Sequence, residues 1–252
     1  MSNTFDVIIL GGGPAGYVCA IRAAQLGLKT AVIEKEKLGG VCVNIGCIPT
    51  KALLHSALVA NTIAHDAKGL GIEVGSVKTN FGVAMKRSRR VSEQNSKGVE
   101  FLMKKNKVTV IAGTGTLQPG KQVAVGQDIY TASKGVVIAT GSRVKGIPQA
   151  GLDLDGKVII SSDEALFLEQ APGRIAVVGA GAVGCEFADI FNAFGSEVTL
   201  VEALPRILPL EDAESSAVVA KSFKKRKITS LAGAMVKSTT VKEGGAILEV
   251  EA

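Results

Sequence analysis

Continuous hydrophobic stretches alternate with glycine-rich turns and helical patterns along much of the chain. Residues 6–34 give a hydrophobic strand, a glycine turn, a helix closed by Gly27 and a second strand that ends at Glu34. The same pattern returns at residues 174–202, at a constant offset of 168 residues, and ends at Glu202. Strands that are hydrophobic throughout are typical of a parallel sheet covered on both faces. The two copies therefore predict two βαβ units and an α/β fold.

The remaining segments give shorter patterns. Helices are predicted over residues 52–68, 81–106 and 212–226. Short strands are predicted near residues 108–112, 122–125 and 135–140 and towards the end of the chain, and turns at residues 113–121 and 139–142. Glycine and proline gather at residues 143–150, which indicates a boundary. We therefore predict two domains, residues 1–145 and residues 146–252.

Both copies carry the spacing G-x-G-x-x-G between the first strand and the helix. The six glycines are Gly11, Gly13, Gly16, Gly179, Gly181 and Gly184. In such a turn the first glycine allows a sharp bend, the second lets the backbone approach a pyrophosphate, and the third lets helix and strand pack closely. The helix after the turn supplies N–H donors and the positive end of its dipole. Two turns of this kind predict two dinucleotide sites.

An acidic residue ends the second strand of each copy, Glu34 in the first and Glu202 in the second. A carboxylate in this place accepts hydrogen bonds from a ribose and repels a 2′-phosphate. The second site is therefore predicted to prefer NAD over NADP, although the basic residue Arg206 is close by in the sequence.

Composition and charge narrow the class of protein. The 252 residues are 46% hydrophobic, include 30 glycines and carry a formal net charge of +6. The basic clusters at residues 86–90 and 224–227 fall in helical patterns and are interpreted as solvated helix faces. With no Trp and two Tyr, the chain has little with which to stack on nucleic acid bases. The hydrophobic stretch 7–21 is broken by glycines and is too short to cross a bilayer. We expect no nucleic acid or membrane partner, and a cytoplasmic location, or a mitochondrial matrix location if a presequence was removed.

Two of the four cysteines, Cys42 and Cys47, lie five residues apart. On a regular helix this spacing gives about 7.5 Å of rise, whereas a disulfide needs α-carbons within about 7 Å of each other. A bond between the two would therefore need a break in any helix, for which Gly46 is suited, while Pro49 is tolerated in a first helical turn. Cys47 would then lie near a helix N-terminus, where a thiolate is stabilised.

Three kinds of site could use this pair: a structural disulfide, a metal site or a redox couple. No metal is expected, because the other cysteines and the two histidines lack ligand spacing; these are Cys19, Cys185, His55 and His65. A structural disulfide across so short a loop would constrain the unfolded chain little. The redox couple is the favoured interpretation.

The segment GGVCVNIGCIPTK, residues 39–51, resembles the signature GGxCxxxGCxPxK of the flavoprotein disulfide reductases, the pyridine nucleotide-disulfide oxidoreductase family. The resemblance extends over nearly the whole chain, through FDVIILGGGPAGYVCAIRAAQLGLKTAVIEK, ATGS at 139–142 and GAGAVGCEF followed by VTLVEALPRILP. Thr50 stands where Ser is also common. The resemblance implies two Rossmann-like domains, an FAD-binding domain with the redox disulfide on the first copy and an NAD-binding domain on the second.

The resemblance also implies residue roles. Cys47 would lie against the flavin as the charge-transfer thiolate, and Cys42 would exchange with the dithiol substrate. Lys51 would lie near flavin N5, paired with Glu186, although an acid so early in a helix could merely complement the helix dipole. The residues implied in cofactor binding are Gly11, Gly13, Pro14, Ala15, Gly16, Glu34, Lys35, Gly40, Lys51, Gly115, Thr140, Gly141, Ser142, Gly179, Gly181, Gly184, Glu186, Glu202 and Val236.

The members most similar to this chain pass electrons from dihydrolipoamide, carried on lipoyl domains of 2-oxoacid dehydrogenase complexes, to NAD. Such members are longer homodimers, so central and C-terminal domains, with an acid–base His–Glu pair, are expected to be absent here. Two alternatives remain at this point: a non-catalytic fragment that holds FAD or NAD, or another reductase of the family, such as a mercuric reductase.

Overall fold

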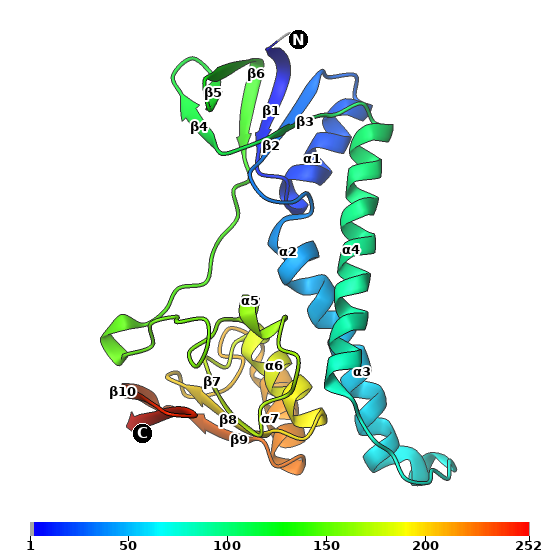
Figure 1. The fold of residues 1–252 in the computed structure, drawn as a ribbon, viewed down its shortest axis with the longest axis vertical. Helices are drawn as coiled ribbons and strands as arrows, with labels where there is room; N and C mark the ends of the chain where they lie inside the picture. The colour runs from blue at the N-terminus through cyan, green and yellow to red at the C-terminus, as the bar shows by residue number, and fades with distance from the viewer. Residues whose placement is uncertain (1–2, 252) are drawn as a thin grey trace. The chain divides into compact units, whose positions relative to one another are not determined.

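The computed structural model describes residues 3–251. The chain forms two compact units (Figure 1). The first comprises residues up to Pro49 together with Arg89–Arg143, and the second comprises Thr50–Ser88 together with residues from Val144 onward. The break after Arg143 lies close to the boundary at 143–150, but residues 50–88 group with the second unit. A reason is the packing of Phe81, whose ring centroid lies 5.9 Å from that of Phe191 and 5.4 Å from that of Phe194.

The first unit contains a six-stranded sheet in the order β3-β2-β1-β6-β5-β4. Four strands are parallel: β1 (Thr4–Leu10), β2 (Thr30–Glu34), β3 (Thr109–Ala112) and β6 (Asp128–Ile138). Strands β4 (Gly115–Gln118) and β5 (Gln122–Val125) extend the sheet in antiparallel pairing. The parallel βαβ unit predicted for the first copy is confirmed, because β1 and β2 pair directly and α1 (Pro14–Gln25) joins them.

The two faces of this sheet are covered differently. Helices α1 and α4 (Phe81–Lys105) supply side chains that pack with Ile9 and Val32 on one face, among them Ala20, Val99 and Met103. The opposite core cluster contains β1 and β2 side chains together with Val123 of β5. The glycine turn between β1 and α1 thus begins at a strand that is buried on both faces.

Cys42 and Cys47 lie on two consecutive helices, α2 (Gly40–Ile45) and α3 (Cys47–Asn61). Helix α3 begins five residues before the predicted helix 52–68, and it passes into a π-helical turn at Thr62–Asp66 and a 3-10 turn at Ala67–Leu70. By length and composition alone, the helical run Gly40–Leu70 could cross a membrane. The run is interrupted at Gly46, between α2 and α3.

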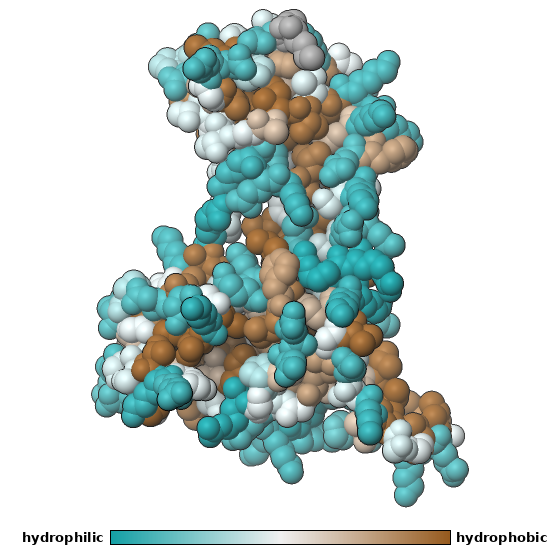
Figure 2. Space-filling model, in the orientation of Figure 1, coloured by the Kyte–Doolittle hydropathy of each residue, from teal (hydrophilic) through white to brown (hydrophobic). Residues whose placement is uncertain are grey.

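The segment that joins α3 and α4 exposes several hydrophobic side chains. Residues 72–80 form no helix or strand, and Ile72, Val74 and Val77 are exposed. Hydrophobic surface is visible at this segment, at the lower right of Figure 2.

The second unit contains a three-stranded parallel sheet in the order β7-β8-β9 and an antiparallel hairpin. The sheet strands are β7 (Arg174–Val178), β8 (Glu197–Glu202) and β9 (Thr229–Ala232), and the hairpin strands are β10 (Met235–Lys242) and β11 (Gly245–Glu251). Helix α6 (Ala182–Ala193) joins β7 to β8, and α7 (Ala213–Lys225) joins β8 to β9. The second βαβ unit is therefore confirmed. Its strand β7 differs from the expected fully buried strand, because it alternates between exposed and half-buried residues.

Further details differ from the sequence-based expectation. The predicted turn at 113–121 contains strand β4, and the strand predicted at 135–140 begins earlier, at Asp128. Helices α2 and α5 (Ser162–Ala165) were not predicted, because six and four residues are too few to show a helical period. The first basic cluster is only partly a solvated face, because Arg87 is half-buried and donates a hydrogen bond to the Ala52 carbonyl at 2.9 Å.

Candidate functional site

The first glycine turn is built so tightly that two of its glycines are required by packing. Gly11 has φ +106°, and a Cβ added there would lie 2.2 Å from the Ala139 carbonyl oxygen. A Cβ on Gly16 would lie 1.8 Å from the carbonyl oxygen of Gly11. A Cβ on Gly13, in contrast, would meet only the Gly40 α-carbon, at 3.8 Å. The middle glycine therefore faces open space, which is where a pyrophosphate approaches the backbone.

The second turn repeats this construction. Gly179 has φ +100°, and a Cβ on Gly184 would lie 1.9 Å from the Gly179 carbonyl oxygen. A Cβ on Gly181 would meet nothing within 4 Å. Helices α1 and α6 both begin at a glycine N-cap without a side-chain cap and without an acid in the first turn. Their first N–H groups are thus available to phosphate, so both turns fit a dinucleotide.

The two strand-ending carboxylates also fasten the turns, a role that the sequence did not reveal. One oxygen of Glu34 accepts from the Gly12 amide at 2.7 Å, and the other accepts from the Glu36 amide at 2.8 Å. In the second copy, one oxygen of Glu202 accepts from the Ala180 amide at 2.7 Å, and the other accepts from the Leu204 amide at 2.9 Å. A carboxylate oxygen has two lone-pair directions. Each carboxylate is therefore held in place and retains acceptor capacity for ribose hydroxyls.

The residue after the first glycine of each turn, Gly12 or Ala180, is held through its carbonyl as well as through its amide. The carbonyl of Gly12 accepts from the Gly39 amide at 2.9 Å, and the carbonyl of Ala180 accepts from the Leu208 amide at 2.7 Å. Gly39 is the N-cap of α2, the helix that carries Cys42. In the first unit, the dinucleotide turn is therefore hydrogen-bonded directly to the start of the cysteine segment.

The predicted break between the cysteines is confirmed. Cys42 is half-buried in α2, Gly46 lies between the helices, and Cys47 is exposed as the first residue of α3. A Cβ on Gly46 would lie 2.9 Å from the Val41 carbonyl oxygen and 3.1 Å from the Cys42 α-carbon. Glycine at this position lets the start of α3 approach the backbone of Cys42, and Pro49 lies in the first turn of α3 as expected.

The predicted ion pair between Lys51 and Glu186 is present in the second unit. Lys51 Nζ of α3 lies 2.5 Å from Glu186 Oε1 of α6, with the side chains 59% and 24% exposed. The pair brings a positive charge to the first turns of α6, beside the second glycine turn. Its role in catalysis stays a prediction.

The other residues implied in cofactor binding are spread over both units. Thr140, Gly141 and Ser142 are exposed and follow β6 after one residue, Ala139. The neighbouring Arg143 guanidinium lies 2.5 Å from the Glu36 carboxylate, and Lys35 is exposed beside it. Gly115 begins β4, where a Cβ would lie 2.4 Å from Leu10 Cδ1.

Two further residues have structural explanations of their own. Gly40 has φ +57°, and a Cβ there would lie 2.7 Å from the Gly13 α-carbon. Val236 is buried in a cluster with Ala150, Val201 and Ala234, so its backbone is the part available to a ligand. Among residues 3–251, no group of three or more His, Cys, Asp or Glu side chains could hold a metal ion.

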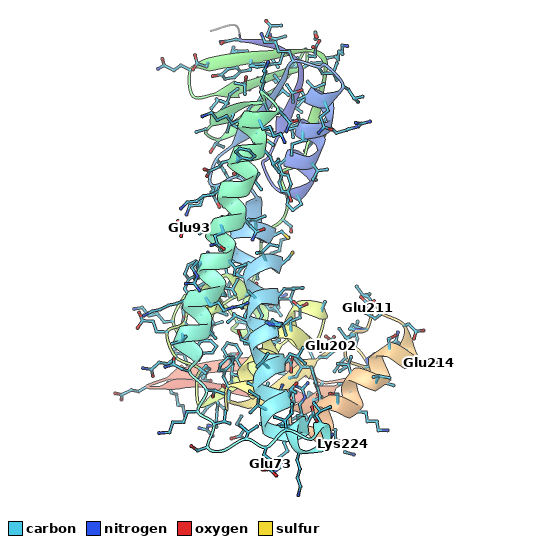
Figure 3. All side chains as sticks on the ribbon, turned by 90° about the vertical axis from the view of Figure 1, so that its right-hand side faces the viewer. Glu73, Glu93, Glu202, Glu211, Glu214 and Lys224 are labelled. Atoms are coloured by element: carbon cyan, nitrogen blue, oxygen red, sulfur yellow. The ribbon has the colours of Figure 1, made fainter. Side chains whose placement is uncertain are left out.

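The loop after Glu202 uses its basic residue internally. Arg206 donates to the carbonyls of Pro209 and Glu211, each at 3.1 Å. Glu202 and Glu211 lie at the two ends of this loop, before α7 (Figure 3). Arg206 thus helps to shape the loop through one nitrogen, Nη2. The preference for NAD over NADP inferred from Glu202 stays a prediction.

Two dinucleotide turns and a cysteine pair at a helix break define the class of dinucleotide-dependent disulfide oxidoreductases. A family model described as pyridine nucleotide-disulphide oxidoreductase matches residues 5–251, so the chain belongs to that family. The family's cofactors, FAD and NAD(H), account for the two turns.

Individual relatives agree with this assignment. The chain is 47% identical to the dihydrolipoyl dehydrogenase of Chlorobaculum tepidum over 254 residues, covering 99% of this chain and 54% of the relative. It is 44% identical to the dihydrolipoyl dehydrogenase of Bacillus subtilis, covering 100% of this chain and 55% of the relative. The chain therefore spans about half the length of the curated relatives it matches.

Solved structures show the same fold. LpdA from Mycobacterium tuberculosis superposes with a TM-score of 0.86 at 28% identity, covering 97% of this chain and 55% of that one. RclA from Escherichia coli, described as an HOCl-induced flavoprotein disulfide reductase, gives a TM-score of 0.82 at 27% identity, covering 98% and 53%. The interpretation as a non-catalytic cofactor-binding piece is not favoured by these relatives.

Proposed function

We propose that the protein carrying this chain is a dihydrolipoyl dehydrogenase, which oxidises protein-bound dihydrolipoamide and reduces NAD. The observation that carries the proposal is the cysteine segment: a thiol on each side of a packed helix break, hydrogen-bonded to a dinucleotide turn. The high identity to dihydrolipoyl dehydrogenases supports dihydrolipoamide as the substrate. Its partners would be the lipoyl domains of 2-oxoacid dehydrogenase complexes, served by a homodimer in the cytoplasm or a mitochondrial matrix.

The sulfur chemistry depends on the order of the two cysteines. In the oxidised protein, a substrate thiolate attacks Cys42 of a Cys42–Cys47 disulfide, which forms a mixed disulfide and releases Cys47 as a thiolate. The second substrate thiolate then attacks the substrate's own sulfur, closes the product disulfide and releases Cys42. Two electrons pass from the dithiol to the cysteine pair. Bound FAD supplies the acceptor for these electrons and the means of passing a hydride to NAD.

The positions of both cysteines suit these roles. Cys47 is the first residue of α3, where the helix dipole favours the negative charge of the released thiolate. Cys42 is held in α2 behind the Gly39 N-cap, so that its backbone is fixed while exchange proceeds. The Lys51–Glu186 pair would keep the lysine charge oriented for a reduced, anionic flavin.

The proposal is tested with the full-length protein purified with FAD. We expect dihydrolipoamide-dependent reduction of NAD, followed at 340 nm, with much slower reduction of NADP. The variants Cys42→Ser and Cys47→Ser should each abolish this reaction while FAD stays bound. Flavin-containing protein that reduces no NAD with dihydrolipoamide, but oxidises NADPH with mercuric ion, would instead support the mercuric reductase alternative.

A further inference from the structure

Helix α4 presents three buried serines one turn apart, Ser88, Ser92 and Ser96. They lie on the same helix as Glu93, which Figure 3 labels. Their exposures are 0%, 1% and 7%. Ser88 bonds within its own helix, to the Met85 carbonyl at 2.8 Å. The other two hydroxyls belong to the first unit and reach the cysteine segment.

Ser92 holds the chain between the two cysteines. Its hydroxyl lies 2.7 Å from the Val43 carbonyl oxygen and 3.2 Å from that of Asn44. Ser96 donates to the Leu38 carbonyl at 3.1 Å. That carbonyl also accepts from the side-chain amide of Asn44, at 3.0 Å. The serines thus bind backbone carbonyls on both sides of Cys42.

The helix break creates the need for these donors. The last carbonyls of a helix lack partners within it, and buried carbonyls without partners are costly. Helix α2 has six residues and ends at Ile45, so the carbonyls of Val43 and Asn44 lie in its last turn. A fully buried hydroxyl from α4 supplies the hydrogen bond that the continuing helix would have supplied.

We propose that Ser92 is a positioning residue for the redox couple: its hydroxyl fixes the chain between Cys42 and Cys47, so that the two thiols stay poised to form their disulfide. The inference rests on the proposed function, in which these cysteines are the redox pair. Holding two reacting groups in place raises their effective concentration for each other. Loss of the hydroxyl should therefore make the disulfide less favourable and easier to reduce.

The test measures the thiol–disulfide equilibrium in the full-length, FAD-containing protein. Wild type, Ser92→Ala and the matched control Ser88→Ala are equilibrated without oxygen in mixtures of reduced and oxidised dithiothreitol. The two thiols of the protein give two electrons and two protons to oxidised dithiothreitol as the protein disulfide forms. After alkylation, peptide mass spectrometry gives the oxidised fraction of Cys42 and Cys47.

We expect Ser92→Ala to lower the equilibrium constant for the protein disulfide about fivefold, which corresponds to a reduction potential about 20 mV higher. Ser88→Ala should stay close to wild type. Ser96→Ala should give a smaller shift of about twofold, because the Leu38 carbonyl keeps the Asn44 amide. If Ser92→Ala yields no flavin-containing protein, Ser96→Ala serves as the test in its place. An unchanged equilibrium constant in Ser96→Ala would then overturn the inference.

Two other outcomes would overturn the inference. In one, Ser92→Ala lowers the unfolding temperature but leaves the equilibrium constant unchanged, which indicates a structural role only. In the other, Ser88→Ala shifts the constant as much as Ser92→Ala does, which indicates general loosening of α4. Failure of the proposed function looks different: wild-type protein would form no Cys42–Cys47 disulfide at any ratio of dithiothreitol forms.

Discussion

Replacing Gly46 by alanine tests whether packing builds the break between the two cysteines. The added Cβ would lie 2.9 Å from the Val41 carbonyl oxygen, 3.1 Å from the Cys42 α-carbon and 3.2 Å from the Val41 carbonyl carbon. All three atoms belong to the backbone, so no side-chain rotation can relieve the contact. Overpacking of this kind costs about 1–3 kcal/mol. The start of α3 would have to move away from Cys42.

A matched control lies in the same unit. Gly98 is exposed in the interior of α4, and a Cβ there would meet nothing within 4 Å. Alanine stabilises a helix interior by roughly 0.5–1 kcal/mol relative to glycine. The same chemical change should therefore act in opposite directions, with the two variants separated by about 1.5–4 kcal/mol.

Thermal unfolding of the full-length protein with FAD provides the assay, together with the thiol–disulfide equilibrium of Cys42 and Cys47. Each kcal/mol moves the midpoint by about 2–4 °C in a chain of roughly 150–250 residues, and by less in a longer protein. We expect Gly46→Ala to unfold at a lower temperature than wild type with a changed disulfide equilibrium, and Gly98→Ala to unfold at a higher temperature with the equilibrium unchanged. Equal midpoints for the two variants would show that packing against Cys42 does not maintain the break.

Three further predictions address charge and reactivity. Glu186→Gln should change the unfolding free energy by no more than about 1 kcal/mol, because its lysine partner is mostly exposed. The same variant should lower the rate of NAD reduction in stopped-flow assays, and an unchanged rate would argue against a role near the flavin. The hydrogen bond from the Ser161 hydroxyl, aided by the bond from the Ser161 amide, lowers the pKa of Glu164. The stability that this carboxylate contributes is present above about pH 4.5 and is lost as the pH falls through the lowered pKa. Glu164→Gln should therefore make the free energy of unfolding less dependent on pH on the acid side. Burial raises the pKa of Cys185 to about 11, which leaves about one thiolate in a thousand at pH 8. Iodoacetamide should therefore label Cys42, the thiol that meets the substrate in the proposed function, well before the buried Cys185 in the reduced protein. Equal labelling of the two would contradict the burial of Cys185.

The sequence predicted the dinucleotide turns because their geometry depends on local spacing. Gly16 packs against the carbonyl of Gly11, five residues earlier in the chain. Gly184 packs against the carbonyl of Gly179 in the same way, at the offset of 168 residues. The fastening role of Glu34 and Glu202 could not be predicted in this way. Which amides face a carboxylate depends on how the loop after the strand folds back, and the two loops have different sequences.

The helix break at Gly46 was predictable, since a bond between residues five apart excludes a regular helix. The hydrogen bonds that support this break could not be predicted from the sequence. Ser92 is 48 residues from Asn44 in sequence, and a serine within a basic helical pattern gives no sign of its acceptor. The partly buried Arg87 shows the same limit, because its charge suggested solvent while its guanidinium reaches the Ala52 carbonyl.

The two copies of the βαβ unit differ in the segment after the second strand. In both, the residue after the first glycine of the turn donates its amide to the carboxylate and accepts a loop amide at its carbonyl. In the first copy that amide belongs to Gly39, which starts the cysteine helix. In the second it belongs to Leu208, in the loop shaped by Arg206. One way of fastening a dinucleotide turn thus connects the first turn to the helix that carries Cys42 and the second turn to the loop after Glu202. The two units share a fold and a way of holding the turn, and they differ in the short segment to which the turn is bonded.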